Sequence, residues 1–199
     1  MPVFVDAAEN AALAAIVDLA DYASLHSAYS ATGANELAGG SPAYARQAIA
    51  WDAPSAGAVS LTGTESFNVP AASTVAWIGL WSAVTTGTFY GMIPNGGFTP
   101  RAFVGATTDT ITAPGHGLTN GQRVVFIAAG STLPTGLAEG TIYWVIGVSG
   151  DTFQVSTTSG GSAVDLTAAG SGFVQRIAPE AYELQGTFEV SDINIVAGS

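Results

Sequence analysis

Short apolar runs separated by turn-forming residues fill positions 111–174, and this pattern restricts the fold of that stretch more than any other feature does. The runs occupy residues 123–126, 142–146 and 152–155, and Gly, Asn, Asp, Ser or Pro stands in the gaps between them. Such spacing is typical of strands joined in hairpins. The stretch therefore predicts a small antiparallel β module, and we find in it no nucleophile with its base, no metal cage and no phosphate cradle.

The charge of the chain is strongly one-sided. It has four arginines, no lysine and fifteen acidic residues, for a formal net charge of −11. Nucleic-acid binding and binding to anionic membranes both rely on Lys and Arg, so we expect neither partner. We expect the acidity to provide solubility and repulsion between copies before assembly, in preference to an ion-binding role.

The composition also limits the chemistry and the surface. Cysteine is absent, which removes disulfide frameworks, zinc–thiolate sites and thiol catalysis. Only 10% of the residues are charged, while 48% are hydrophobic and four are tryptophan. Such a charge-poor surface is easily buried against neighbouring subunits, and the alternative is a large core within a monomer. The length of 199 residues fits one domain or two.

One amphipathic helix is predicted between residues 7 and 22. Asp6 is a candidate N-cap, and Glu9 lies three residues later, as in a capping box. We expect the apolar stripe of the helix to dock on the sheet that follows. The stripe comprises Leu13, Ile16, Val17 and Ala20.

No segment has the pattern of a secretory signal or a membrane span. Residues 1–5 lack a basic start followed by a long apolar stretch, and the apolar run at 11–17 is too short to cross a bilayer. We expect a soluble protein made in the cytoplasm of the producing cell.

Several strands are predicted before residue 100, at 22–27, 46–51, 58–62, 65–69, 74–81 and 87–93. We expect 58–62 and 65–69 to be joined near Gly63. The run 74–81 is apolar on both faces, which predicts a central strand covered on both sides, with 87–93 as its partner. Trp77 and Trp81 should share one face of that strand and pack in a core. The polar loop at 31–42 is long enough to be a functional loop or an arm that orders on contact.

The C-terminal tail bears on domain organisation. Residues 186–190 and 193–196 are strand-like and resemble 58–93 in composition more than the segment just before them. We therefore expect an outer β domain at 1–100 that is completed by strands at 178–199. Residues 101–177 would be a module inserted at a loop tip, where insertion is tolerated best. The alternative is two consecutive domains followed by a tail.

The motifs favour structural roles. His26 and His116 are the only histidines, and neither has metal-ligand spacing, so we expect the ring of His116 to bond neighbouring carbonyls at a turn. Asn120-Gly121 predicts a type I′ turn, in which both residues have positive φ. For Arg123 we expect a salt bridge at the rim of the sheet. The glycine pairs near 160 and 170 lack the helix and the lysine of a phosphate site.

Two pairs of carboxylates raise the possibility of glycoside hydrolysis, which uses a pair of Asp or Glu residues. The pairs are Glu180 with Glu183 and Asp18 with Asp21. The first pair flanks a connecting loop and the second lies on a helix face, so both predict solvated surface. We assign no catalytic, cofactor-binding or metal-binding residue and expect that the chain is not an enzyme.

A family resemblance runs through most of the chain. The inserted stretch resembles a β module found in many structural proteins of tailed bacteriophages. The matching residues are His116-Gly117-Leu118, Asn120-Gly121, Val124-Val125-Phe126, Leu133-Pro134, Gly136-Leu137, Tyr143-Trp144-Val145, Asp151-Thr152-Phe153-Gln154-Val155-Ser156 and Gly160-Gly161.

The outer part is similar to a family of small phage virion proteins of the minor tail or tail-fibre-like kind. The matching residues are Tyr22-Ala23-Ser24-Leu25-His26, Thr32-Gly33-Ala34-Asn35-Glu36, Gly39-Gly40-Ser41-Pro42-Ala43-Tyr44-Ala45-Arg46-Gln47 and Val75-Ala76-Trp77-Ile78-Gly79-Leu80-Trp81. The resemblance implies a virion component and supports the insertion, because the outer family also occurs without the module. It supplies no catalytic residues.

Taken with the residue patterns, the resemblance leads to one expected fold and function. We expect a mainly β fold, an antiparallel sandwich or barrel with one N-terminal helix and an inserted hairpin module. The function expected is structural: a head-decoration or minor capsid protein, trimeric, contacting the major capsid protein or other virion subunits. Its place would be the virion, assembled in the host cytoplasm. A minor tail or receptor-binding subunit is the alternative, and a carbohydrate-active enzyme is a third reading.

Overall fold

The computed structural model describes residues 6–96, 100–191 and 193–196, and it divides the chain into two compact units. The first, here the outer unit, consists of Met1–Ile93 and Glu180–Ser199. The second, here the barrel unit, consists of Pro94–Pro179. The chain thus leaves the outer unit once and returns to it once. The observed boundaries at 93/94 and 179/180 lie seven and two residues from the predicted boundaries at 100/101 and 177/178.

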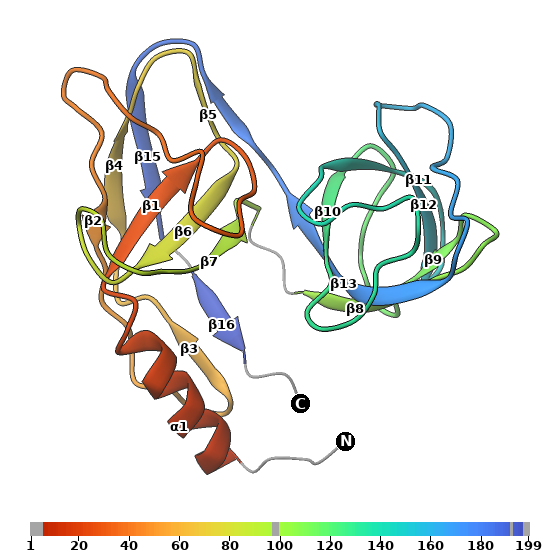
Figure 1. Cartoon of the computed structure of the whole chain (residues 1–199), viewed down its shortest axis with the longest axis horizontal. Coiled ribbons are helices and arrows are strands. Elements are labelled where there is room, and N and C mark those ends of the chain that lie inside the picture. Colours follow the sequence, from red (N-terminus) through yellow and green to blue (C-terminus); the bar gives the residue numbers. More distant parts are fainter. Residues whose placement is uncertain (1–5, 97–99, 192, 197–199) are drawn as a thin grey trace. The chain divides into compact units, whose positions relative to one another are not determined.

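Antiparallel strands are the main regular structure of both units, and the described part of the chain begins with one helix (Figure 1). The predicted mainly β fold with one N-terminal helix is confirmed. In the outer unit the elements are α1 (Asp6–Val17), β1 (Tyr22–His26), β2 (Gln47–Ala48), β3 (Ala58–Ser60), β4 (Glu65–Val69), β5 (Ser73–Val75), β6 (Trp77–Trp81), β7 (Phe89–Pro94), β14 (Glu180–Tyr182), β15 (Gly186–Val190) and β16 (Asn194–Val196).

A four-stranded sheet in the order β2-β1-β6-β7 forms one layer of the outer unit. All five residues of β6 are buried, as predicted for a strand covered on both faces. The predicted single strand at 74–81 is interrupted, however. At Ala76 the chain passes from β5, which pairs with β14, to β6, which pairs with β1. Strand 46–51 was also predicted too long, because only Gln47 and Ala48 pair with β1.

The C-terminal strands form a long ribbon with β3, β4 and β5. The pairs are β3 with β16, β4 with β15 and β5 with β14, all antiparallel. Val59 lies opposite Ile195 and Phe67 opposite Phe188, so the register changes by only one residue between these pairs. The strands predicted at 58–62 and 65–69 are β3 and β4, joined through Gly63 as expected, and each pairs with the C-terminal segment. Residues 180–196 therefore complete the outer unit.

The helix is shorter than predicted. It ends at Val17, and Tyr22 already belongs to β1. Leu13 and Val17 are buried and pack with Val59 of β3, whereas Ile16 is 45% exposed. Ala20 is buried but lies beyond the end of the helix. Its spacing from Ile16 and Val17 extended the apolar stripe in the sequence and made the predicted helix too long. Asp6 is the first described helical residue, and Glu9 lies beside Gly57.

The barrel unit closes on itself in the strand order β10-β11-β12-β9-β8-β13. Its core is a cluster of aromatic and aliphatic side chains that includes Phe126, Tyr143 and Phe153. The segment predicted as hairpins is thus a complete barrel with its own core. Its strands are β8 (Arg101–Gly105), β9 (Ile111–Thr112), β10 (Arg123–Ile127), β11 (Tyr143–Ser149), β12 (Thr152–Ser156) and β13 (Gly170–Ile177).

The first and last strands of the barrel unit pair with each other, which brings its two ends together. Arg101 of β8 lies opposite Val174 of β13. The N–H of Ala178 donates to the carbonyl of Asn95, so the entering and leaving segments are also in contact. Such an arrangement allows the whole unit to be inserted between two consecutive parts of another fold.

The turn at Asn120-Gly121 differs from the type I′ prediction. Gly121 has φ of +86°, but Asn120 is not among the residues with positive φ. The N–H of Gln122 donates to the carbonyl of Thr119, and the side chain of Asn120 accepts from the N–H of Val148. A turn with positive φ only at its third residue is of type II, where glycine is favoured for the same steric reason.

Candidate functional site

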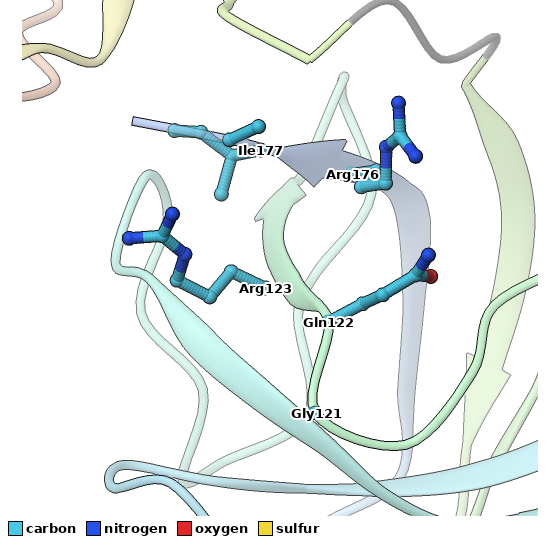
Figure 2. Close-up of a pocket in the computed structure, with 6 residues that line it drawn as sticks. Gly121, Gln122, Arg123, Arg176 and Ile177 are labelled. Carbon is cyan, nitrogen blue, oxygen red and sulfur yellow. The ribbon is translucent and has the colours of Figure 1, made fainter. Parts of the chain in front are cut away.

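A shallow pocket of about 260 Å³ lies at one end of the barrel unit (Figure 2). Two strand ends and the turn before β10 form it. Gly121 and Gln122 lie on that turn. β10 begins at Arg123, which pairs with Ile177 at the end of β13, and both residues are labelled in Figure 2. The pocket is lined by Gly121, Gln122, Arg123, Arg176, Ile177 and Ala178.

The two arginines of the pocket are held by backbone carbonyls. Arg176 donates to the Gly96 carbonyl from Nε at 3.2 Å and from Nη2 at 2.6 Å. Arg123 donates from Nη2 to the Pro179 carbonyl at 3.3 Å, and its guanidinium lies over the Trp144 ring at 5.6 Å. Each guanidinium has five N–H donors, so donors remain on both. The two side chains extend to opposite sides of the pocket (Figure 2).

These arginines have no acidic partner within the described part of the chain. The salt bridge found there joins Arg46 to Glu36 at 2.7 Å, in the outer unit. The rim salt bridge expected for Arg123 is therefore replaced by a carbonyl and an aromatic ring. Since the guanidinium groups point apart, one small anion would not contact both, whereas an acidic surface with several carboxylates would.

Charge is divided unequally between the two units. Eleven of the fifteen acidic residues and one arginine belong to the outer unit, while the barrel unit has four acidic residues and three arginines. The barrel unit is thus nearly neutral, and the outer unit carries almost the entire negative charge. The pocket contributes two of the arginines in the less charged unit.

A second polar cluster is buried in the outer unit, on β1 and β6. Ser24 Oγ lies 2.6 Å from His26 Nε2, and the indole N–H of Trp81 donates to Ser24 Oγ at 2.8 Å. His26 Nδ1 lies 2.8 Å from the Ala34 carbonyl, which makes Nδ1 the protonated nitrogen and Nε2 the acceptor of the Ser24 hydroxyl proton. The chain Trp81–Ser24–His26–Ala34 is thereby fully hydrogen-bonded.

This serine–histidine contact has the separation of a nucleophile and its general base. Both residues have no exposed surface, however, and a Cβ on Gly79 would lie 2.5 Å from Ser24 Oγ and from His26 Nε2. Burial also lowers the pKa of His26 below the ordinary 6.5, which keeps the ring neutral. With backbone packed against both reacting atoms, the arrangement fixes the fold locally. The two residues share one face of β1 because they are two positions apart.

Residues 31–42, which the sequence predicts to be a functional loop or an arm that orders on contact, pack on the sheet of their own chain. Ser27 N–H donates to the Asn35 carbonyl and Leu37 N–H to the Leu25 carbonyl. Gly33 lies so close to the Trp81 ring that a Cβ would be 2.4 Å from it. The loop therefore covers the tryptophan face of β6.

Arg46 ties this loop to the turn after β6. It donates to both carboxylate oxygens of Glu36, at 2.9 and 2.7 Å, and to the carbonyls of Ala83 and Thr86. Its guanidinium also lies 3.5 Å above the Trp81 ring. The hydroxyl of Tyr44 donates to Glu36, and burial raises the pKa of Tyr44. Four hydrogen bonds from Arg46 and one from Tyr44 end on acceptors inside the outer unit, so the group acts as a structural clamp.

His116 is buried in the barrel unit, with its ring at 5.0 Å from that of Phe153. Its Nδ1 accepts from the N–H of Leu118 at 2.8 Å, so the predicted bond to a carbonyl is wrong in direction. Nε2 has no hydrogen-bond partner in the described residues. The histidine shapes the turn before β10, as its position in the sequence indicated.

The carboxylates considered for hydrolysis do not line the arginine pocket of the barrel unit. Glu180, Glu183, Asp18 and Asp21 are all exposed, and Glu180 accepts a hydrogen bond from the Tyr182 hydroxyl. Among the described residues there is no group of three potential metal ligands. Over the same residues, no helix combines the length and apolarity needed to span a membrane.

Sequence reasoning missed the Ser24–His26 contact and the presence of Arg123 and Arg176 in one pocket. The alternation of Ser and His in β1 was a visible signal for the first. The second needs the β10–β13 pairing, in which Val124 lies opposite Arg176, and that pairing joins residues far apart in sequence. No family model, no curated protein and no solved structure matches this chain.

Proposed function

We propose that this chain is a structural component of a tailed-bacteriophage virion, a decoration or minor capsid protein that binds the head as a trimer. Its partners would be further copies and the major capsid protein, and it would join the particle in the host cytoplasm. The observation that carries the proposal is the nested construction. A closed barrel, in the stretch that resembles a phage module, is inserted into an outer unit that its own C-terminal ribbon completes.

The construction suits a passive building element. The outer unit has its own core, to which β4 and β15 contribute, and the barrel unit has a separate core. Each unit should therefore keep its fold when the other unit binds a neighbouring subunit. A decoration protein has to bind neighbours through side chains that the monomer leaves exposed. Large apolar side chains of this kind are Ile16, Leu19, Val84, Tyr90 and Leu184 in the outer unit.

The acidity also fits an exterior position. A surface of high negative charge resists nonspecific association with nucleic acid and with other copies. Only short-range apolar and backbone contacts at a specific site would overcome that repulsion. We therefore place the outer unit against the capsid and expect the barrel unit to project from it.

Imaging and counting test this proposal. A cryo-EM reconstruction of the phage that encodes the chain should contain its outer unit at the capsid surface. Quantitative gel analysis of the same particles should give hundreds of copies, on the order of the number of capsid sites. Density restricted to the tail, with a handful of copies, would reject the head-decoration assignment in favour of a minor tail or receptor-binding subunit.

The tail assignment has one structural feature in its favour. The arginine-lined pocket of the barrel unit offers unused N–H donors in a unit that the outer fold does not need for closure. A receptor-binding subunit would use such a pocket for an acidic ligand. Copy number separates the two assignments without any knowledge of that ligand.

A further inference from the structure

A second pocket, here the outer pocket, lies in the outer unit and has a volume of about 370 Å³. One side is formed by residues 36–39 and 44–46, and the other side by residues 84–86 of the turn after β6. All of these residues belong to the outer unit, so the outer pocket is complete within it. Its volume lies in the range of about 300–1,000 Å³ that is typical of small-molecule sites.

The clamp between Arg46 and Glu36 forms the polar wall of the outer pocket. A guanidinium has five N–H groups, and Arg46 uses four of them. Nε and one N–H of Nη2 bond to Glu36, and the two N–H groups of Nη1 bond to backbone carbonyls. Within the described residues, the second N–H of Nη2 is left without an acceptor.

Glu36 likewise keeps one acceptor position. Its Oε1 accepts from the Tyr44 hydroxyl at 3.1 Å and from Arg46 Nε at 2.9 Å, which occupies both lone pairs. Among the described residues, Oε2 accepts only from Arg46 Nη2, at 2.7 Å. The Glu36 side chain is 22% exposed. A donor and an acceptor are therefore left side by side on the wall of the outer pocket.

Two neighbouring hydroxyl groups of a sugar ring complement this pair of atoms. Each hydroxyl can both donate and accept a hydrogen bond, so one can donate to Glu36 Oε2 while the next accepts from Arg46 Nη2. Both bonds would involve a charged partner, and hydrogen bonds of this kind are the stronger ones. Since the clamp already fixes both side chains, a ligand does not have to order them.

The turn side of the outer pocket supplies further contacts. Val84 is 46% exposed and offers methyl groups to the C–H face of a sugar ring, and Thr85 is exposed and offers a hydroxyl. The Trp81 ring is not available for stacking, because the Arg46 guanidinium lies 3.5 Å above it. A ring with hydroxyls on its edge and C–H groups on its faces fits these surroundings better than a flat aromatic ligand.

Charge favours a neutral ligand. The Glu36–Arg46 pair is neutral as a whole, whereas the outer unit has eleven acidic residues and one arginine. The field of such a unit repels anionic sugars, such as uronic acids.

We propose that the outer pocket binds a neutral sugar residue through two adjacent hydroxyl groups. Glu36 Oε2 accepts from one hydroxyl, Arg46 Nη2 donates to the other, and Val84 contacts the C–H face. The inference goes beyond the proposed virion role and does not rest on it, because a sugar site can be present at any position in the particle.

Two-dimensional NMR of the ¹⁵N-labelled full-length chain tests this proposal. The probes are methyl α-mannoside, methyl β-galactoside and methyl β-glucoside. At least one of them should shift the amide signals of residues 36–46 and 84–86 in a saturable manner. We expect a dissociation constant on the order of 1 mM, as for a ligand of about thirteen heavy atoms with ordinary efficiency.

Two variants should weaken this binding. Glu36→Gln should raise the dissociation constant about tenfold, because a charged acceptor is lost. Val84→Ser should raise it about threefold, because apolar contact is lost while the clamp stays intact. If Glu36→Gln opens the clamp and loses the native spectrum, Val84→Ser decides the question.

Matched controls make the same changes outside the outer pocket. Val104→Ser alters an exposed valine of the barrel unit, and Glu183→Gln neutralises an exposed glutamate of the outer unit. Both should bind the glycoside as the unaltered protein does and keep its melting temperature.

Four results would overturn the inference. They are no shift of the pocket signals by any of the three glycosides, unchanged binding in Val84→Ser, tighter binding of methyl β-glucuronide than of methyl β-glucoside, and binding of N-acetylglycinamide in place of the glycosides. The last result would assign the outer pocket to a peptide, which offers a carbonyl and an N–H to the same two atoms. The particle reconstruction decides the virion role separately from all four.

Discussion

Ser24 and His26 lie on one face of β1 and share a buried hydrogen bond of 2.6 Å from Oγ to Nε2. Trp81 on the neighbouring strand donates to the same serine, and the Ala34 carbonyl accepts from the other side of the histidine. Four residues from two strands and a loop are thus joined by one polar chain. It holds residues 31–42, the segment expected to be a functional loop or an arm that orders on contact, against the sheet.

Ser24→Ala should lower the free energy of unfolding by about 1–3 kcal/mol, because the Trp81 N–H and His26 Nε2 lose their shared partner in a buried site. Chemical denaturation measures this difference. Ser27→Ala is the matched control, since Ser27 is exposed and its hydroxyl bonds weakly at 3.4 Å. Equal stability of the two variants would mean that the buried chain contributes nothing to folding.

Stability should fall as the pH decreases below 6.5. Burial lowers the pKa of His26 in the folded state, so the unfolded state binds the proton more tightly. The stabilising contribution is complete above the ordinary pKa of 6.5 and is lost as the pH falls toward the lowered value. Denaturation of the unaltered protein and of His26→Gln between about pH 7 and 5 measures it. The variant should have a flatter profile, and identical profiles would contradict the assignment.

Trp77→Ala should cost about 3–5 kcal/mol, because the side chain is 1% exposed and packs against the Tyr29 ring at 5.2 Å. Trp144→Ala in the barrel unit provides the comparison. That indole is only half-buried, so its loss should cost less. A change near zero at Trp77 in denaturant melts would show that β6 is not covered on both faces.

The outer unit should fold without the barrel unit. Replacing Asn95–Pro179 by a short Gly-Ser linker leaves all three ribbon pairs and the four-stranded sheet intact. Circular dichroism and a cooperative thermal transition should report a folded β protein. Aggregation of the shortened chain would indicate that the two units depend on each other. The difference in melting temperature between the shortened chain and the full chain measures how much the inserted barrel unit changes the stability of the outer unit.

Local patterns in the sequence predicted most strands but only some of their partners; 87–93 was expected beside 74–81, and β7 does neighbour β6. Glu65–Val69 and Gly186–Val190 were both recognised from their residue types, but nothing in the local pattern indicated that they pair with each other. The two strands are more than a hundred residues apart in the sequence. Hydrophobic alternation identifies a strand and its buried face but does not indicate which distant strand it pairs with. The break at Ala76 was missed for the same reason, since an apolar run does not reveal a change of sheet.

Turn and site details failed where tertiary contacts decide them. Asn120 accepts a hydrogen bond from Val148 and so keeps negative φ, although the Asn-Gly pair favours a type I′ turn. Ile16 and Ala20 completed a helical stripe in the sequence, but the chain leaves the helix at Val17 to reach β1. Arg123 and Arg176 line one pocket only because β10 pairs with β13. Residue types indicated the elements, and long-range pairing determined their assembly.

A reconstruction of the intact phage particle tests the central claim most directly. The account predicts ordered density for the outer unit on the outside of the head, repeated at equivalent capsid sites, with the barrel unit attached to it. Particles that lack the chain altogether, while the free protein accumulates in infected cells, would contradict a structural role in the virion.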